Sequence, residues 1–385
     1  MLRHALYLAL RYLASSPGRS AVLVLGSAVA LFLPLFTGLA AERIEGSLLA
    51  RAESSPVVIG VKGDEFDLTM SALYFHGQVR ENVPFSSADP IRAAGYGLAV
   101  PLYVQHTIGG SPLVGTTLDY FDARGLELWD GRRPAVLGEV VAGATVAEAF
   151  QLQVDDSVRS DLSNLYNIAG AYPILLQVVG VLEPTGGPDD EAFFTDVKTT
   201  WVLDGYLHGH EEVTVANSLN GEAAGENLEA TAAIFMISEI TEANRATFHF
   251  HGDLGHLPVT SVLVFPDDQR DHDLLLGDYA LHETQHAIRP VSVVREILGI
   301  VLRVRDALAA TFSAVAVSTL AFFGLVLSLS LRLRSSELTL MRRIGCSRGT
   351  IATMVGAEVV LVVLAAGLVA AAGTFAGLAM LDTLL

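Results

Sequence analysis

Several histidines lie in pairs or triplets along the sequence and could bind a metal ion. Neutral imidazoles at positions i and i+2 on one strand face can share a Zn²⁺ ion, and Glu211 or Glu212 could add a further ligand. The alternative is a set of surface or hydrogen-bonded histidines, which we favour because a histidine-rich tract is only a compositional signal. The candidate metal ligands are His208, His210, His249, His251, His256, His282 and His286.

The segment His282–His286 (HETQH) matches the zinc-protease motif H-E-x-x-H. On a helix, its two histidines would lie one turn apart and bind zinc, and Glu283 would act as the base. Pro290 follows closely, however, and Thr284, His286 and Ile288 alternate as strand residues do. This context favours a strand, so a zinc-dependent membrane protein or protease is the weaker hypothesis.

The chain has two lysines, Lys62 and Lys198, and neither lies in a phosphate-binding loop. Such a loop needs Gly-x-x-x-x-Gly-Lys-Ser/Thr, because its lysine reaches the β- and γ-phosphates. Lys62 lacks this spacing and a following hydroxyl, and Lys198 is preceded by Asp196-Val197. We therefore expect no ATP-binding site, no cofactor and no enzymatic activity in this chain. If it takes part in transport or force generation, a separate ATPase must supply the energy.

The composition indicates a membrane protein with one large polar insertion. Of the 385 residues, 51% are hydrophobic and 17% are charged, and the mean hydropathy is +0.46. Residues 42–306 hold 39 Asp/Glu and 16 Lys/Arg, a net charge of −23, whereas the rest of the chain holds 8 Arg and 3 acids, a net charge of +5. Because phosphate binding needs clustered cations, this acidic insertion excludes nucleic acid as a partner.

Three segments are long and apolar enough to cross a bilayer, which takes about 20 residues. They are residues 20–41, 307–331 and 351–385, and Glu358 is an internal charge of the third. Positive charge near the ends of spans stays cytoplasmic. We therefore expect residues 1–19 and 332–350 to be cytoplasmic and residues 42–306 to lie outside. The arginines that set this orientation are Arg3, Arg11, Arg19, Arg332, Arg334, Arg342, Arg343 and Arg348.

The first apolar segment could also be a cleaved signal peptide, since Gly38-Leu39-Ala40 is a passable cleavage site. Its apolar run exceeds the usual length of a signal peptide's apolar region, about 7–15 residues, so we favour an uncleaved anchor. Residues 1–14 predict a short amphipathic helix on the inner leaflet. Four glycines in the third segment predict close helix packing. They are Gly356, Gly367, Gly373 and Gly377.

The outside domain is expected to be α+β, because strand patterns and helix patterns are mixed along residues 42–306. The runs Pro56–Val61, Ile174–Leu182 and Ser261–Phe265 predict strands. The segment Glu139–Phe150 predicts a helix, and the polar residues 208–232 predict a mobile loop. The predicted fold is thus a membrane protein with three transmembrane helices and a large α+β extracytoplasmic domain between the first and the second.

The segment Ser336–Arg348 (SELTLMRRIGCSR) carries the most specific motif. Its order of an acid, apolar residues, two basic residues, a glycine and further basic residues resembles the loop after the second span of MacB/FtsX/LolC-type ABC transporter permeases. Parts of the outside domain are similar to the MacB-like periplasmic core domain. These parts are Gly115–Phe121, Gly125–Leu128, Gly131-Arg132, Ala135–Ala142 and Val178–Gly186, with Val58–Gly63 and Leu73-Tyr74 similar to one branch of the permeases.

The resemblance implies the transmembrane permease subunit of such a transporter, in a bacterial inner membrane with its N-terminus in the cytoplasm. It implies a cytoplasmic ABC ATPase dimer, a second permease copy (identical or different) and surrounding membrane lipids as partners. The family usually has a fourth helix, which this sequence lacks. Either the chain is a shortened branch of the family, or the sequence is a truncated piece of a longer chain. The cargo would be lipophilic, a lipoprotein or a peptide; alternatively, the chain would be a signalling permease that regulates an extracytoplasmic partner.

The resemblance also implies where the ATPase would bind. Without it, the arginines of residues 332–350 would be explained by the positive-inside rule alone. With it, they belong to a coupling site. The residues of this site are Glu337, Leu340, Arg342, Arg343, Gly345 and Arg348.

Overall fold

The computed structural model describes residues 2–77, 79–161, 173–209, 240–242, 244–250 and 252–382. The chain divides into two compact units. One, the helical unit, comprises Met1–Gly46 and Glu296–Leu385. The other, the α+β unit, comprises Ser47–Arg295 and lies inside the predicted 42–306 insertion.

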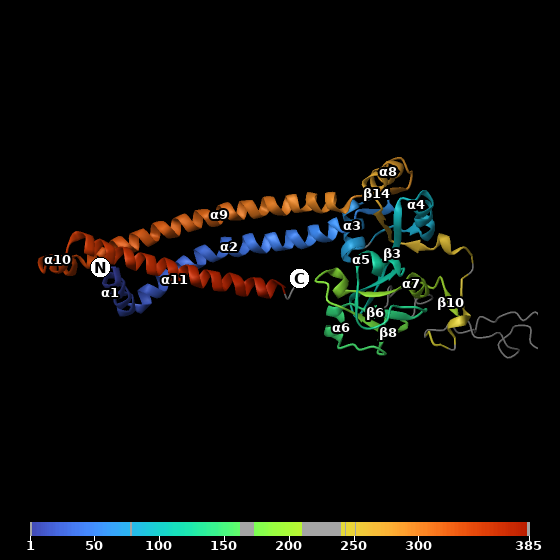
Figure 1. The fold of residues 1–385 in the computed structure, drawn as a ribbon, viewed down its shortest axis with the longest axis horizontal. Coiled ribbons are helices and arrows are strands. Elements are labelled where there is room, and N and C mark those ends of the chain that lie inside the picture. Colours follow the sequence, from blue (N-terminus) through green and yellow to red (C-terminus); the bar gives the residue numbers. More distant parts are fainter. Residues whose placement is uncertain are drawn as a thin grey trace, which may run out of the picture. The chain divides into compact units, whose positions relative to one another are not determined.

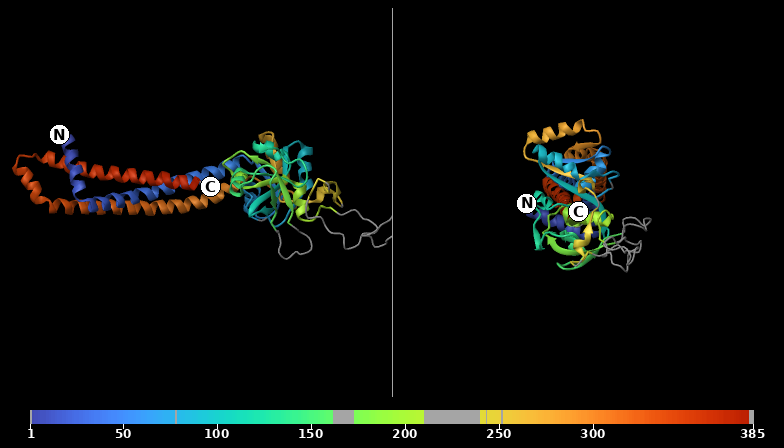
Figure 2. Two further views of the ribbon diagram at one scale, coloured as in Figure 1. Left: turned by 90° about the horizontal axis from the view of Figure 1, so that it is seen from below. Right: turned by 90° about the vertical axis from the view of Figure 1, so that its right-hand side faces the viewer.

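Within the helical unit, three long helices run alongside one another (Figures 1 and 2). By length and composition, α2, α9 and α11 could each cross a membrane. Helix α1 confirms the short helix predicted over residues 1–14. Helices α2 and α9 also contain residues of the α+β unit. The bounds are α1 Leu2–Ser15, α2 Pro17–Glu53, α9 Pro290–Leu333, α10 Ser335–Arg343 and α11 Arg348–Asp382.

Helices α2 and α11 pack together through two aromatic rings and two glycines. Phe32 and Phe36 stack at a ring-centroid distance of 5.5 Å. A Cβ atom on Gly377 would lie 2.7 Å from Phe36, and one on Gly373 would lie 3.3 Å from Phe32. These glycines therefore let the rings approach the α11 backbone, as small residues do between membrane helices. Gly356 and Gly367 have open space at the Cβ position instead.

The α+β unit is built on one mixed sheet, whose strand order is β14-β1-β13-β3-β4-β9-β6-β8-β5, with β7 paired to β8. Pairs β4–β9 and β6–β8 are parallel, and the other pairs are antiparallel. The long strand β3 joins the two halves. The strands are β1 Val57–Val61, β3 Gly97–Ile108, β4 Ser111–Thr116, β5 Leu128–Gly131, β6 Glu139–Ala142, β7 Ser157–Arg159, β8 Leu175–Leu182, β9 Phe193–Asp196, β13 Ser261–Pro266 and β14 Gln285–Ile288.

Short helices and two small strand pairs complete this unit (Figure 1). Its core contains fully buried aromatic side chains, among them Trp201, Tyr120 and Phe193. The strand pairs are β2 Val83–Pro84 with β12 Pro258–Val259, and β10 His208–Gly209 with β11 Phe248–His249. The helices are α3 Glu65–Tyr74, α4 Asp89–Ala94, α5 Asp119–Arg124, α6 Ala144–Phe150, α7 Val197–Leu203 and α8 Gln269–Ala280.

One predicted element is wrong. The segment Glu139–Phe150 forms strand β6 and helix α6, not a single helix. Strand β6 pairs with β9 on one side and β8 on the other, so all four of its residues are buried. After Glu139, residues 140–142 are continuously apolar and lack the alternation of a half-exposed strand. Gly143 separates the strand from the helix. A side chain would not fit at this position, because a Cβ atom there would lie 2.3 Å from the backbone oxygen of Asp189.

The other strand predictions are confirmed. The apolar runs Pro56–Val61, Ile174–Leu182 and Ser261–Phe265 contain strands β1, β8 and β13. The predicted mobile loop over residues 208–232 falls mostly on residues 210–239, which lie outside the described part of the chain.

Candidate coupling site

The segment between α9 and α11 carries an exposed apolar pair beside exposed arginines. Leu340 and Ile344 are 61% and 73% exposed. Arg342, Arg343 and Arg348 are exposed as well. Glu337 belongs to the same helix, α10. Exposed apolar side chains gathered on a short helix are typical of a surface that a partner covers.

The end of this segment has a fixed backbone geometry. Gly345 has φ +99°, a conformation that a glycine adopts without strain. The Cys346 N–H donates to the Met341 carbonyl at 3.0 Å and closes the end of α10. The Ser347 hydroxyl then accepts from the Thr350 N–H at 3.1 Å and caps α11. The predicted coupling residue Gly345 thus lies in the turn between α10 and α11, and Arg348 is the first residue of α11.

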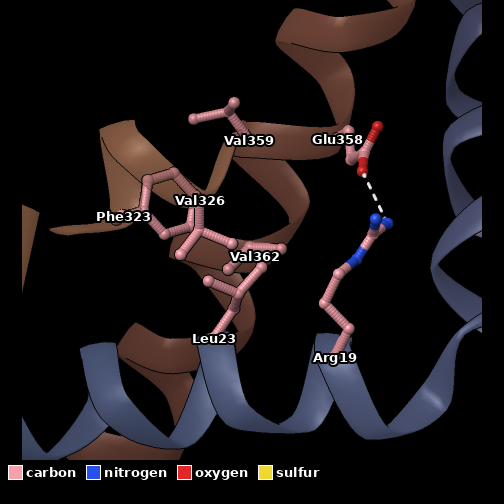
Figure 3. A pocket seen from close by; sticks show the side chains of 7 residues that line it. All are labelled: Arg19, Leu23, Phe323, Val326, Glu358, Val359 and Val362. Atoms are coloured by element: carbon pink, nitrogen blue, oxygen red, sulfur yellow. Dashed lines mark ion pairs between the residues drawn. The ribbon is translucent and has the colours of Figure 1, made fainter. Parts of the chain in front are cut away.

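A buried carboxylate in α11 lies next to this segment. The Glu358 side chain is 8% exposed and is surrounded by apolar residues (Figure 3). Its Oε2 accepts from Arg334 Nη1 at 3.3 Å, and its Oε1 lies 3.7 Å from Arg19 Nη2. Tyr12 lies below both guanidinium groups, with its ring centroid 3.3 Å from Arg334 and 4.8 Å from Arg19. We call Tyr12, Arg19, Arg334 and Glu358 the Glu358 cluster.

The cavity beside this cluster is too small for cargo. Its volume is about 10 Å³, the space of roughly one water molecule. Its other lining residues come from α2, α9 and α11, and Figure 3 shows them around Arg19 and Glu358. They are Leu23, Phe323, Val326, Val359 and Val362. The cluster therefore acts on the helices themselves rather than on a bound molecule.

A second buried ion pair fixes the end of α2 inside the α+β unit. Arg51 Nη1 donates to Asp189 Oδ2 at 2.5 Å, and Nη2 donates to Oδ1 at 3.0 Å. The Tyr120 hydroxyl donates to the same carboxylate at 2.6 Å, and Arg51 Nε donates to the Leu73 carbonyl at 3.0 Å. Burial and the charge of Asp189 raise the pKa of Tyr120 to about 12, so it stays a neutral donor. We call Arg51, Tyr120 and Asp189 the Arg51 cluster.

A comparison with known families identifies the chain. The profile of the MacB-like periplasmic core domain matches residues 20–234, more than half of the sequence. The chain belongs to this family. It is a MacB-like ABC transporter permease, a membrane protein with a periplasmic segment. From here on, the α+β unit is called the periplasmic domain.

Two solved structures are similar to part of the chain. The periplasmic region of MacB from Actinobacillus actinomycetemcomitans is 13% identical with a TM-score of 0.36, and the match covers 65% of this chain and 97% of that one. The extracellular domain of the noncanonic ABC-type transporter YknZ from Gram-positive bacteria is 9% identical with a TM-score of 0.32, and the match covers 60% of this chain and 98% of that one. No curated protein matches the sequence.

The periplasmic domain holds the end of α2 at further points. Tyr74 donates through its hydroxyl to the Leu48 carbonyl at 2.8 Å. Arg124 donates to the hydroxyls of Ser54 and Ser55 at 2.9 and 2.6 Å. Together with the Arg51 cluster, these bonds fix the last turn of α2 and the residues before β1.

The ends of the domain meet in two adjacent strands. Strand β1 follows α2, and β14 precedes α9. They pair antiparallel, with Val58 opposite Ile288 and Val61 opposite Gln285. Beside them, Arg295 lies 3.5 Å from Glu53, an exposed pair between the start of α9 and the end of α2.

The H-E-x-x-H segment does not form a helix. Helix α8 ends at Ala280 and β14 begins at Gln285, so the favoured strand is confirmed for Gln285 and His286, whereas residues 282–284 precede it. His282 Nδ1 accepts from the Gln285 N–H at 3.1 Å, which gives this nitrogen a protein partner. Burial lowers the pKa of His286. The two histidines thus lack the helical geometry that a zinc protease of this motif needs.

The other candidate metal ligands are spread over the domain. His208 and His249 lie opposite each other in the β10–β11 pair. His256 is exposed beside Asp253. His210 and His251 lie outside the described residues. In the described ranges, no three His, Cys, Asp or Glu side chains are grouped so that they could hold a metal ion.

Sequence reasoning missed the Arg51 cluster and the partners of Glu358. Asp189 lies 138 residues from Arg51 in the sequence, and each is an ordinary charged residue in its local context. Glu358 itself could be recognised as a charge inside an apolar segment. Arg19 and Arg334 were predicted only to orient the spans, so their common partner could be found only in the fold.

Proposed function

We propose that this permease transmits the ATP-driven motion of a separate cytoplasmic ATPase to its periplasmic domain, for export or extraction of a lipophilic, lipoprotein or peptide cargo. In this proposal the protein lies in the bacterial inner membrane and spans it with α2, α9 and α11, with its N-terminus and α10 in the cytoplasm. The observation that carries the proposal is the segment Leu340–Arg348. It exposes apolar and basic side chains side by side, and its backbone is fixed by the hydrogen bonds at the end of α10 and the start of α11.

The connections along the chain support this role. Only Arg334 separates α9 from α10, and α9 continues to Pro290, next to β14. Helix α2 continues to the buried Arg51 and then to β1. A displacement of α10 by an ATPase would therefore pass along continuous helices toward β14, at the edge of the periplasmic sheet, and toward its neighbour β1.

In this proposal the chain is not an enzyme, and the partner subunits bind ATP and Mg²⁺. Two permease copies would join one ATPase dimer. Helix α9 supports the need for a neighbour, because no residue in its most apolar stretch is buried by the described part of the chain. In a membrane, lipids and a second permease copy would cover this face.

The test is to purify the tagged chain in mild detergent and to identify stoichiometric partners by mass spectrometry. We expect a P-loop ATPase with the wild-type chain, and its loss from the double variant Arg342→Glu/Arg343→Glu, because the changed charges would repel the docking surface. The matched control is Arg80→Glu/Arg270→Glu, which changes the same charge at exposed sites in the periplasmic domain. This control should keep the ATPase.

Two results would contradict the proposal. One is a double variant that retains the ATPase as well as the control does. The other is a wild-type chain that purifies alone with stoichiometric zinc, which would favour the histidines as the functional residues. If the ATPase binds, accumulation of a lipophilic or peptide cargo after loss of the charges would distinguish export from a signalling role.

A further inference from the structure

Burying the Glu358 carboxylate of α11 among apolar side chains is energetically unfavourable, so other contacts must compensate for it. It is the one acidic residue between Arg348 and Leu381 of α11, with Val359, Val362 and Leu23 around it. An ionised carboxylate in a transmembrane segment costs several kcal/mol unless it is paired. A neutral residue would pack here without that cost, so the carboxylate must make contacts that a neutral side chain could not replace.

Those contacts come from two other helical segments. Arg19 lies in the first turn of α2, whereas Arg334 lies between α9 and α10. The two guanidinium groups reach one oxygen each of the same carboxylate, at 3.7 and 3.3 Å. They carry like charges and lie over the same ring of Tyr12. The Glu358 charge therefore offsets the repulsion between them.

Arg334 occupies a special place in the chain. It is the residue between the end of α9 and the start of α10, and its backbone angles (φ −93°, ψ 9°) differ from those of a helix. The direction in which α10 leaves α9 depends on this residue. Its side chain is 10% exposed, so it is held inside the helical unit rather than in solvent.

We infer that Glu358 is a positioning residue for α10: by holding Arg334 and Arg19 together, it fixes the joint between α9 and α10. The inference rests on the proposed function, in which α10 receives the ATPase. A load on α10 must then either move α2 and α11 together with α9 or separate Arg334 from Glu358. The shared carboxylate thus links α10 to α2, α9 and α11.

The full chain allows a direct test of this joint. Cys346, in the turn after α10, is its single cysteine and is partly exposed, so one spin label can be placed there without other changes. We expect Glu358→Gln to shorten the rotational correlation time of this label by about twofold, because α10 loses its fixed joint. The measurement uses the permease alone in lipid nanodiscs, without ATPase.

Three further variants separate positioning from general damage. Val360→Gln places the same new side chain at an exposed site of α11 and should leave the label as in the wild-type chain. Glu358→Asp keeps the charge and should restore most of the restriction. The swap Glu358→Arg/Arg334→Glu keeps one acid between two arginines and should restore part of it. Size-exclusion profiles confirm that each variant is folded.

The outcomes for the two proposals are distinguishable. Unchanged label motion in Glu358→Gln would overturn the positioning role, whether or not an ATPase binds. Equal mobilisation in Val360→Gln or in Glu358→Asp would overturn it too. Faster motion of the Cys346 label in Glu358→Gln, but not in Val360→Gln or Glu358→Asp, would support the positioning role of Glu358. If the same chain bound no ATPase, the coupling role of α10 would be overturned while the positioning role stood.

Discussion

The two buried arginine–carboxylate clusters of this permease are built differently. In the periplasmic domain, Arg51 and Asp189 form a bidentate pair at 2.5 and 3.0 Å, and Tyr120 adds a third bond. In the helical unit, Glu358 is shared by two arginines at 3.3 and 3.7 Å, and the Arg19 side chain is 32% exposed. The carboxylate thus forms an ion pair with one arginine in the first cluster and with two arginines in the second.

This difference indicates two kinds of joint. A short, bidentate pair with side chains only 10% and 3% exposed holds one geometry, because both partners lose much when it is distorted. Longer, single contacts lose less per ångström, and partial exposure of Arg19 lets water replace one of them. The Arg51 cluster therefore suits a permanent attachment of α2 to its domain, whereas the contacts of the Glu358 cluster are easier to distort under load.

The largest effect should follow from breaking the permanent joint. Asp189→Asn leaves Arg51 buried without its counter-charge, so the periplasmic domain should lose about 3–5 kcal/mol of stability. Thermal unfolding followed by tryptophan fluorescence checks this in the full chain, because Trp129 and Trp201 both lie in that domain. Glu358→Gln should lower this transition much less.

The control for that comparison is Asp267→Asn, which removes an exposed carboxylate from the same domain. It should leave the transition within about 0.5 kcal/mol of the wild-type value. If Glu358→Gln destabilised the domain as strongly as Asp189→Asn, the distinction between the two joints would be lost.

A smaller effect is expected where apolar contact, not charge, holds α2 to α11. Gly377→Val would place a side chain against Phe36, because a Cβ atom added there would lie only 2.7 Å from the ring, and should cost about 1–3 kcal/mol. The readout is the detergent concentration at which the full chain loses helical circular dichroism. Gly367→Val is the matched control, since its Cβ position is open, and an equal effect of both variants would contradict the packing argument.

The smallest expected effect is a pH dependence of the stability that arises from His286 in β14, the strand before α9. Burial lowers the pKa of His286 in β14, with Glu65 opposing and Lys62 adding to the shift. The unfolded chain therefore binds a proton near pH 6.5 that the folded chain binds only at lower pH, so stability falls as the pH drops below that value. Acidification from about pH 7.5 to 5.5 should lower the Tm less in His286→Gln than in the wild-type chain. An equal fall in both would exclude His286 as a contributor.

The elements that sequence reasoning predicted are those with a strong local pattern. The long segments are visible because they are apolar and almost free of charge. The runs around β1, β8 and β13 are visible because most of their side chains are buried and apolar, although Gln177 in β8 is polar and exposed. The same property misled the prediction for Glu139–Phe150, since a buried strand followed by a helix has the composition of one apolar helix.

Some residues of the candidate site could also be predicted from the local sequence, and others could not. The exposed side chains of α10 follow from the local sequence, and Gly345 is a turn residue by type. The Arg51 cluster depends on bringing residues 51, 120 and 189 together, and the partners of Glu358 come from helices far apart in the chain. Such contacts are set by the topology, which one sequence does not display.

The antiparallel pairing of β1 with β14 determines how the domain responds to force. Because α2 leads into β1 and α9 leaves from β14, both helices pull on the same end of one two-strand ladder. If the helices slide past each other, the ladder is loaded in shear, and its hydrogen bonds resist together. If the helices splay apart, the load peels the ladder from the Val58–Ile288 pair, one bond at a time. The β1–β14 pairing by itself therefore resists sliding of α2 past α9 more strongly than their separation.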